Sequence, residues 1–138
     1  MIYVIDTNVI IHYLRERTEV VKNLRKSISE GIELLIPRAV DYEIRRGLEL
    51  LSATKKATVY KALLDPNGKC HIVDMGEDIW DKARENYVKL KRKGFTVGEI
   101  DILIGSFCQL HHYPLITDNT KDFVNMDGIK LITWTEAL

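Results

Sequence analysis

Two acidic residues stand where apolar sequence surrounds or precedes them. Asp6 directly follows the apolar run at residues 2–5, and Asp101 lies inside the apolar segment at residues 100–105. An ionised carboxylate that is removed from water without a partner costs several kcal/mol or more, so a compensating group is required. A divalent cation is such a group, because hard cations such as Mg²⁺ take oxygen ligands and usually retain several waters. The sequence therefore indicates a carboxylate site for a divalent cation.

Three further acids could complete this site. Glu43 lies beside the apolar residues Val40 and Ile44, Asp118 follows the apolar run at residues 115–117, and Asp122 comes one helical turn later. Several carboxylates crowded together repel one another, and some of them would be protonated near neutral pH unless a cation is bound. The candidate catalytic and metal-binding residues are therefore Asp6, Glu43, Asp101, Asp118 and Asp122.

Each of these acids also has an ordinary structural explanation. Asp6 and Asp118 could cap helices or lie in turns. Glu43 could pair with Arg46 one turn further along a helix. Asp101 could pair with a basic residue elsewhere. Asp122 could be an ordinary acidic residue in the first turn of a helix. Because 20 of the 138 residues are acidic, composition and spacing leave both interpretations open.

The elements that must position these acids alternate along the chain. Short apolar runs, partly β-branched, predict buried strands at about residues 2–5, 33–36, 71–73, 115–117 and 131–133. Amphipathic or apolar segments predict helices at about residues 7–16, 18–30, 37–51, 52–64, 77–93, 99–112 and 121–125. This alternation predicts an α/β fold with a mostly parallel central sheet of about five strands.

Local signals mark where these elements begin and end. Thr18 could cap the second helix, Pro37 suits the first turn of the third, and Thr96 with Glu99 forms a capping box before the sixth. A turn is predicted at residues 65–68. In open α/β sheets, ligands bind beyond the carboxyl ends of the strands. If the strands that precede Asp6 and Asp118 are parallel neighbours, both side chains project at the same edge.

Composition limits the class of protein but not the partner. The chain has 46% hydrophobic residues and a formal net charge of +0, which neither implies nor excludes nucleic acid. Its length, without repeats or linkers, predicts a single domain over residues 1–138. Cys70 and Cys108 show no zinc-ligand spacing and are expected to be reduced. We expect no secretory signal, no membrane span and a cytoplasmic protein.

Four segments, in order, resemble the sequence motifs of PIN domains. They are residues 4–11 around Asp6-Thr7-Asn8, 36–47 around Glu43, 99–105 around Asp101, and 117–123, which has the Thr-x-Asn-x-x-Asp-Phe form. Their order and spacing, and the length of the chain, resemble those of VapC toxins from bacterial and archaeal toxin–antitoxin modules. The resemblance covers essentially the whole chain and implies a three-layer α/β/α PIN-like fold.

The resemblance also implies a function: a Mg²⁺- or Mn²⁺-dependent endoribonuclease that forms a homodimer and binds a cognate antitoxin. Asp6 and Asp101 would be the principal metal ligands, and Glu43 would complete the acidic pocket. For the fourth acid the motif favours Asp122, whereas the position at a strand end favours Asp118. Hydrogen bonds that orient the acids would come from Thr7, Asn8, Thr117 and Asn119.

The chemistry implied is hydrolysis of an RNA phosphodiester by a water whose pKa the cation lowers. Glu43 or the fourth acid would accept a proton from that water. A structured RNA loop, such as one in tRNA or rRNA, is the expected substrate. The backbone of the RNA would be held by basic residues, for which the candidates are Arg15, Arg38, Arg45 and Arg46. No catalytic role is expected for His12, His71, His111 or His112.

Two alternatives from other functional classes remain. A non-catalytic PIN-like module that binds protein or RNA would not need intact acidic positions, so the presence of all of them argues against it. A metal-dependent phosphatase would also use carboxylates. However, the Asp6-Thr7-Asn8 segment lacks the second aspartate that haloacid-dehalogenase-type phosphatases place two residues after the nucleophile, and no Walker-type glycine-rich loop is present.

Overall fold

A five-stranded, fully parallel sheet forms the centre of the computed structural model, which describes residues 1–65 and 68–135. The strand order is β3-β2-β1-β4-β5. The strands are β1 (Ile2–Ile5), β2 (Glu33–Pro37), β3 (Cys70–Val73), β4 (Leu115–Ile116) and β5 (Leu131–Ile132). The predicted parallel sheet of about five strands is therefore confirmed.

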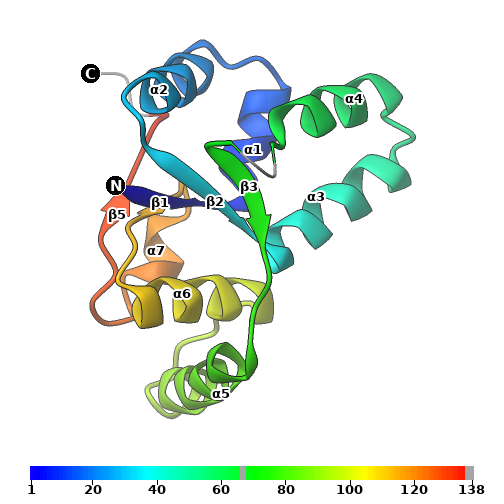
Figure 1. Ribbon diagram of the computed structural model, residues 1–138. Coiled ribbons are helices and arrows are strands. Elements are labelled where there is room, and N and C mark those ends of the chain that lie inside the picture. Colours follow the sequence, from blue (N-terminus) through cyan, green and yellow to red (C-terminus); the bar gives the residue numbers. More distant parts are fainter. Residues whose placement is uncertain (66–67, 136–138) are drawn as a thin grey trace.

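Helices cover both faces of this sheet and complete the predicted three-layer arrangement (Figure 1). In the view shown, α2 and α4 lie above the sheet, α5 and α6 lie below it, and α3 extends beyond the end of β2. The helices are α1 (Thr7–Leu14), α2 (Thr18–Ser29), α3 (Arg38–Leu50), α4 (Thr54–Leu63), α5 (Glu77–Arg92), α6 (Glu99–His111) and α7 (Thr120–Phe123).

Several of the residues predicted to start helices were assigned the wrong position, although the helices themselves form. The residue at the cap position of the sixth helix is Gly98, which has no side chain that could form a capping hydrogen bond. The predicted capping box of Thr96 and Glu99 therefore does not form. Thr18 is the first residue of α2 rather than its cap. Pro37 ends β2 and occupies the cap position of α3. The predicted turn at 65–68 includes Pro66 and Asn67, which lie outside the described residues.

The core is built from the strands and from one helix that is apolar almost all round. Side chains of β1, β2 and β4 such as Val4, Leu34 and Leu115 are fully buried. Within α6, all residues from Ile104 to Cys108 are buried. A helix buried on nearly all sides leaves little freedom in its position. The first turn of α6, which carries Asp101, is therefore fixed relative to the sheet.

Gly105 in α6 gives a test of how tightly this helix packs. A Cβ atom added there would lie 2.5 Å from Met126 Sδ and 3.3 Å from Ile129 Cδ1, so the buried side chain of Met126 must move. Gly105→Ala is expected to lower the free energy of unfolding by about 1–3 kcal/mol, measured by urea denaturation. Gly47→Ala in α3 is the matched control, because no atom lies within 4 Å of its added Cβ. It should stabilise the protein by about 0.5–1 kcal/mol. Equal effects of both changes would contradict tight packing at Gly105.

No helix in the described part of the chain has both the length and the apolar composition needed to cross a bilayer.

Candidate acidic active site

The candidate site lies at the carboxyl ends of β1 and β4, where the order of strands along the sheet changes direction. β1 pairs with β2 on one side and with β4 on the other, and Ile5 stands opposite Ile116. Consequently Asp6 and Thr117 leave the sheet side by side, and the Asp6 amide donates to the Ile116 carbonyl at 2.9 Å. This is the strand-switch position at which open α/β sheets bind ligands. The condition on which Asp6 and Asp118 were expected at one edge, that their strands are parallel neighbours, is therefore met.

Asp6 is enclosed at this edge, with only 2% of its surface exposed. Its carboxylate accepts hydrogen bonds from the Thr7 amide at 2.7 Å and from Thr117 Oγ1 at 2.7 Å. Asn8 Nδ2 donates to it more weakly at 3.4 Å. Asp6 therefore caps α1, so this residue is both a helix cap and a candidate acid of the site. Three of the predicted orienting residues touch it.

Three other helices bring acids to the same place. Glu43, in α3, accepts a hydrogen bond from Thr7 Oγ1 at 2.6 Å. Asp101 lies in the first turn of α6, and Asp122 lies in α7. Both are joined by Asn119, whose Nδ2 donates to Asp101 Oδ2 at 3.2 Å and to Asp122 Oδ2 at 2.8 Å. We call Asp6, Glu43, Asp101 and Asp122 the acidic cluster.

The pKa values of two members show how crowded the cluster is. Burial raises the pKa of Asp6 from 3.8 to about 6, with the hydrogen bonds from Thr117 and Thr7 opposing it and the negative charge of Glu43 adding to it. The pKa of Asp101 is raised from 3.8 to about 7, mainly by burial and additionally by the negative charges of Asp6, Asp122 and Glu43. Carboxyl groups with such pKa values are partly protonated near neutral pH unless positive charge is supplied.

Asp118 does not join this cluster. Its Oδ2 lies 2.7 Å from His12 Nε2, and its Oδ1 accepts a hydrogen bond from Thr135 Oγ1. Its amide donates to Asn8 Oδ1 at 3.2 Å. The two candidates for the fourth acid therefore differ in their hydrogen bonds, although the negative charge of Asp118 also contributes to the raised pKa of Asp6. Asp122 is linked to Asp101 through Asn119, whereas Asp118 is occupied by other partners.

His12, for which the sequence predicted no catalytic role, contacts Asp118 next to the acidic cluster. It stands four residues after Asn8 on α1, so both side chains lie on one face of that helix. Both contact Asp118. The spacing of four from a residue of the first motif was the available signal. His71 and Glu33, by contrast, form a pair at 3.3 Å between β3 and β2, away from the acids.

The donor set fits a hard divalent cation. In the described part of the chain, no basic side chain forms an ion pair with Asp6, Asp101 or Asp122, so their charge is not offset by protein cations. Within residues 1–65 and 68–135, no three His, Cys, Asp or Glu side chains form a group that could by itself hold a metal ion. A hard divalent cation such as Mg²⁺ usually binds through one or two carboxylates and fills its other positions with water and substrate phosphate, so it does not require three such side chains in one group. The five candidate ligands are not gathered into one shell.

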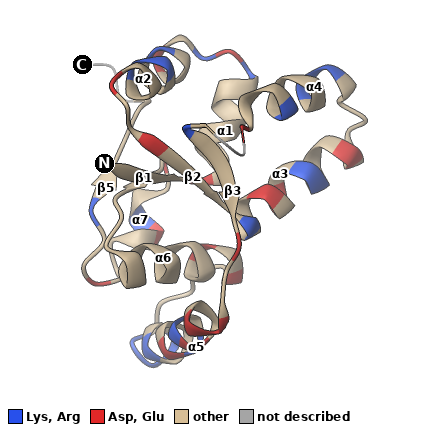
Figure 2. Ribbon diagram, viewed as in Figure 1, with Lys and Arg blue, Asp and Glu red and all other residues tan. Residues whose placement is uncertain are grey.

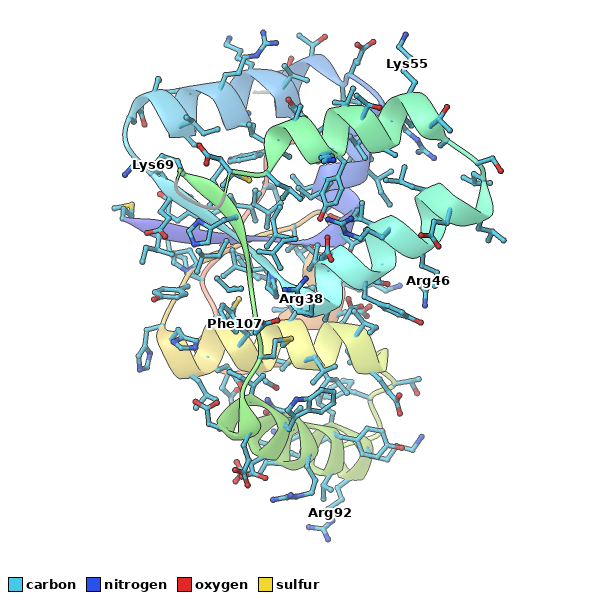
Figure 3. All side chains as sticks on the ribbon, turned by 45° about the vertical axis from the view of Figure 1, so that its right-hand side comes forward. Arg38, Arg46, Lys55, Lys69, Arg92 and Phe107 are labelled. Atoms are coloured by element: carbon cyan, nitrogen blue, oxygen red, sulfur yellow. The ribbon has the colours of Figure 1, made fainter. Side chains whose placement is uncertain are left out.

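The four arginines expected to bind RNA differ in whether their guanidinium groups already contact acidic side chains. Arg38 donates to Asp74 at 2.8 Å, and Arg45 donates to the buried Asp41 at 2.7 Å. Arg46, which projects from α3 in Figure 3, lies 3.8 Å from Glu43. Arg15 lines a cavity of about 130 Å³ together with Glu43. Lys and Arg are spread over several helices rather than gathered on one face (Figure 2).

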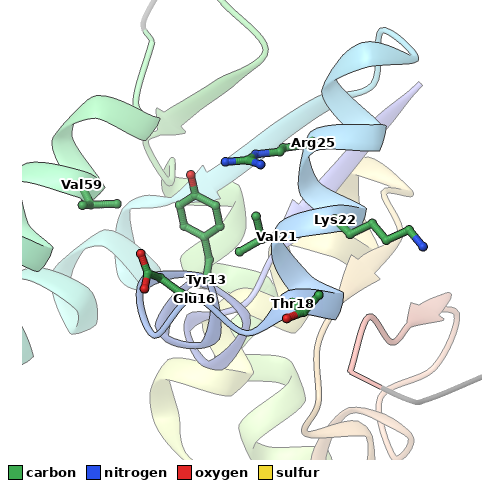
Figure 4. A pocket seen from close by; sticks show the side chains of 7 residues that line it. All are labelled: Tyr13, Glu16, Thr18, Val21, Lys22, Arg25 and Val59. Atoms are coloured by element: carbon green, nitrogen blue, oxygen red, sulfur yellow. The ribbon is translucent and has the colours of Figure 1, made fainter.

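A larger hollow, of about 580 Å³, lies between α1, α2 and α4 (Figure 4). The Tyr13 hydroxyl points into it between Arg25 and Val59. None of the acidic cluster lines this hollow. It therefore adds nothing to the chemistry at the strand ends.

Comparison with known proteins agrees with this geometry. The family described as PIN domain matches residues 3–129. The chain is 25% identical over 135 residues to "Ribonuclease VapC2" of Rickettsia felis, covering 97% of this chain and 98% of that protein. It is 26% identical over 129 residues to "Ribonuclease VapC1" of Methanocaldococcus jannaschii, covering 92% and 84%. A solved structure of VapBC2 from Rickettsia felis, bound to a DNA fragment from its promoter, contains a chain with the same fold. The TM-score is 0.83 at 22% identity, over 97% of this chain and 99% of that one.

Proposed function

This chain belongs to the PIN domain family, and on that premise we propose that it is a divalent-metal-dependent endoribonuclease. The observation that carries the proposal is the acidic cluster. Four carboxylates from separate elements meet at the strand-switch edge, and two of them have pKa values raised to about 6 and about 7. The names of two curated relatives, both ribonucleases, support RNA as the substrate.

We assign the roles of the side chains from their positions. Asp6 and Asp101 would hold the cation, with Asp122 as the fourth acid and Glu43 beside them. When bound, a divalent cation offsets the charge of the phosphate and lowers the pKa of a water. Glu43, which is partly exposed, would accept the proton of the attacking water. The water oxygen forms a bond to phosphorus in line with the 3′-oxygen, whose bond to phosphorus breaks. Thr117 and Asn119 keep the acids oriented through the hydrogen bonds described above.

The proposal includes partners. We propose that residues 1–138 form a single domain, that it assembles as a homodimer, and that it is the toxin of a toxin–antitoxin pair with a cognate antitoxin. Support for the antitoxin comes from structural neighbours that are complexes, such as VapBC-1 of Haemophilus influenzae and a toxin–antitoxin complex from Klebsiella pneumoniae. Exposed aromatic side chains such as Trp80 and Tyr42, 57% and 54% exposed, offer contact surfaces. Among the basic candidates, Arg15 lines the same small cavity as Glu43 and would contact the RNA there.

Metal dependence of RNA cleavage is the direct test. Purified protein should cleave a mixed tRNA and rRNA substrate with Mg²⁺ or Mn²⁺, and EDTA should abolish the cleavage, because the acids then hold no cation. Restoring the divalent ion in excess over EDTA should restore cleavage. Fragments are measured on denaturing gels. Cleavage that persists in EDTA would refute the metal mechanism, and hydrolysis of small phosphomonoesters without RNA cleavage would favour a phosphatase.

A further inference from the structure

His12, Asp118 and Thr135 form a chain of contacts beside the acidic cluster. We propose that His12 is a positioning residue that acts through Asp118: it holds the segment from Thr117 to Asn119 against the acidic cluster, and Asp118 is not a metal ligand. This inference rests on the proposed function, because it concerns how the same site is kept in order. Its parts come from α1, from the segment between β4 and α7, and from the end of the described chain.

The direction of each hydrogen bond follows from what each group can do. Asp118 is a carboxylate and can only accept, so His12 Nε2, 2.7 Å from Asp118 Oδ2, is the donor of that hydrogen bond. Arg17 Nη1 lies 3.3 Å from His12 Nδ1 and 3.4 Å from His12 Nε2, beside the same ring. Thr135 Oγ1 donates to the other oxygen of Asp118. The carboxylate is thus held at both oxygens by groups from two distant parts of the sequence.

Asp118 stands between two residues that orient the acids. Thr117 Oγ1 donates to Asp6 at 2.7 Å, and Asn119 Nδ2 donates to both Asp101 and Asp122. The Thr117 hydroxyl also accepts from the Asn119 amide at 2.9 Å. A shift of Asp118 would therefore move both residues at once. Hydrogen-bonding partners of ligating carboxylates tune metal affinity, because they fix the direction of the ligand oxygens.

The same contacts explain why Asp118 is not placed as a ligand. Its oxygens are engaged by His12 and Thr135, and its side chain is about one-fifth exposed. Asp122, in contrast, shares Asn119 with Asp101. Both oxygens of Asp6 are hydrogen-bonded as well, so the difference between the two candidates for the fourth acid lies in their partners: Asp118 contacts His12 and Thr135, whereas Asp122 contacts the residue that also holds Asp101. The geometry instead makes Asp118 a link between α1 and the segment that carries Asn119.

The test is direct Mn²⁺ binding by isothermal titration calorimetry, without RNA, on the full chain. His12→Ala should weaken Mn²⁺ binding about tenfold, within the range for loss of groups that orient metal ligands. His12→Gln should recover most of the affinity, because its amide can donate to Asp118. His111→Ala, at the far end of α6 from Asp101, is the matched control and should bind as the wild type does. Thermal unfolding in EDTA shows whether each variant is folded.

A double-mutant cycle separates positioning from ligation. If His12 acts through Asp118, Asp118→Ala should weaken Mn²⁺ binding as much as His12→Ala does, and the double variant should be no weaker than either. A much larger loss in Asp118→Ala, additive with His12→Ala, would overturn the inference and make Asp118 a ligand. Wild-type affinity in folded His12→Ala would also overturn it. Failure of the wild type itself to bind Mn²⁺ would instead refute the proposed function.

Discussion

Asp6→Asn and Asp101→Asn are each expected to reduce RNA cleavage more than about 100-fold, at saturating Mg²⁺. Loss of a group that only orients a metal ligand costs about 10–100-fold, and loss of a ligand oxygen with its charge should exceed that. Asparagine nearly preserves the shape of the side chain, so the folded state is retained. Asp122→Asn should show a loss of similar size, because this acid shares Asn119 with Asp101. Initial rates on a defined RNA oligonucleotide provide the measurement.

Asp81→Asn provides the matched control for this series. Asp81 is an exposed acid of α5 that pairs with Arg84 at 3.2 Å, and such surface pairs contribute little. The control should cleave RNA at the wild-type rate. If Asp6→Asn and Asp101→Asn both retain more than about one-tenth of wild-type activity, the cluster is not the catalytic centre and its carboxylates serve folding alone.

The sheet could be predicted from sequence because the signals for its strands are local and recur along the chain. Buried parallel strands are short apolar runs, and the alternation with helices leaves few topologies to consider. The expectation that Asp6 and Asp118 follow strand ends at one edge came from two apolar runs and one general rule for α/β sheets, given that the two strands are parallel neighbours. Helix starts were less predictable. At α6 the chain uses Gly98 rather than a threonine side chain, and tertiary packing of an apolar helix outweighs a cap of about 1 kcal/mol.

The partners of individual acids could not be predicted, because they depend on contacts between distant segments. Asp118 and Asp122 are both acidic residues near one strand end, and sequence alone left either as the fourth acid. What separates them is Thr135, seventeen residues away, and His12, on the other side of the sequence. Likewise, Arg45 was a candidate for RNA, but its guanidinium pairs with Asp41, which the Tyr60 hydroxyl also contacts at 2.7 Å. Such pairings follow from the fold.

Without divalent cations, the protein is expected to lose stability as the pH rises from about 5 to about 7.5. Asp6 and Asp101 have pKa values of about 6 and about 7 in the folded protein, above the usual 3.8, so between these limits the folded state binds more protons than the unfolded state. Stability falls with rising pH wherever the folded state binds the extra protons. One pKa unit corresponds to about 1.4 kcal/mol, so even a partial effect should lower the melting temperature by about 5 °C or more.

Mg²⁺ should reverse this loss, because a cation favours the ionised acids and binds only the folded site. The melting temperature at about pH 7.5 should therefore rise with Mg²⁺ concentration, with a smaller rise at about pH 5, where protons compete with the metal. Differential scanning fluorimetry in EDTA and in a Mg²⁺ series measures both effects. Equal shifts at both pH values would show that Mg²⁺ acts elsewhere on the protein.

Asp101→Asn isolates the contribution of the acid with the higher pKa. Asparagine resembles the protonated carboxyl group, so in EDTA at about pH 7.5 this variant should be more stable than the wild type, and its stability should depend less on pH. Mg²⁺ should stabilise it little. Asp81→Asn should reproduce the wild-type profile, because that acid is exposed and pairs with Arg84. The variant that loses cleavage would thus gain stability, which is expected if the carboxylates are held together for binding a cation rather than for folding. A wild type that grows more stable over this pH range, or an Asp101→Asn profile parallel to it, would contradict this account.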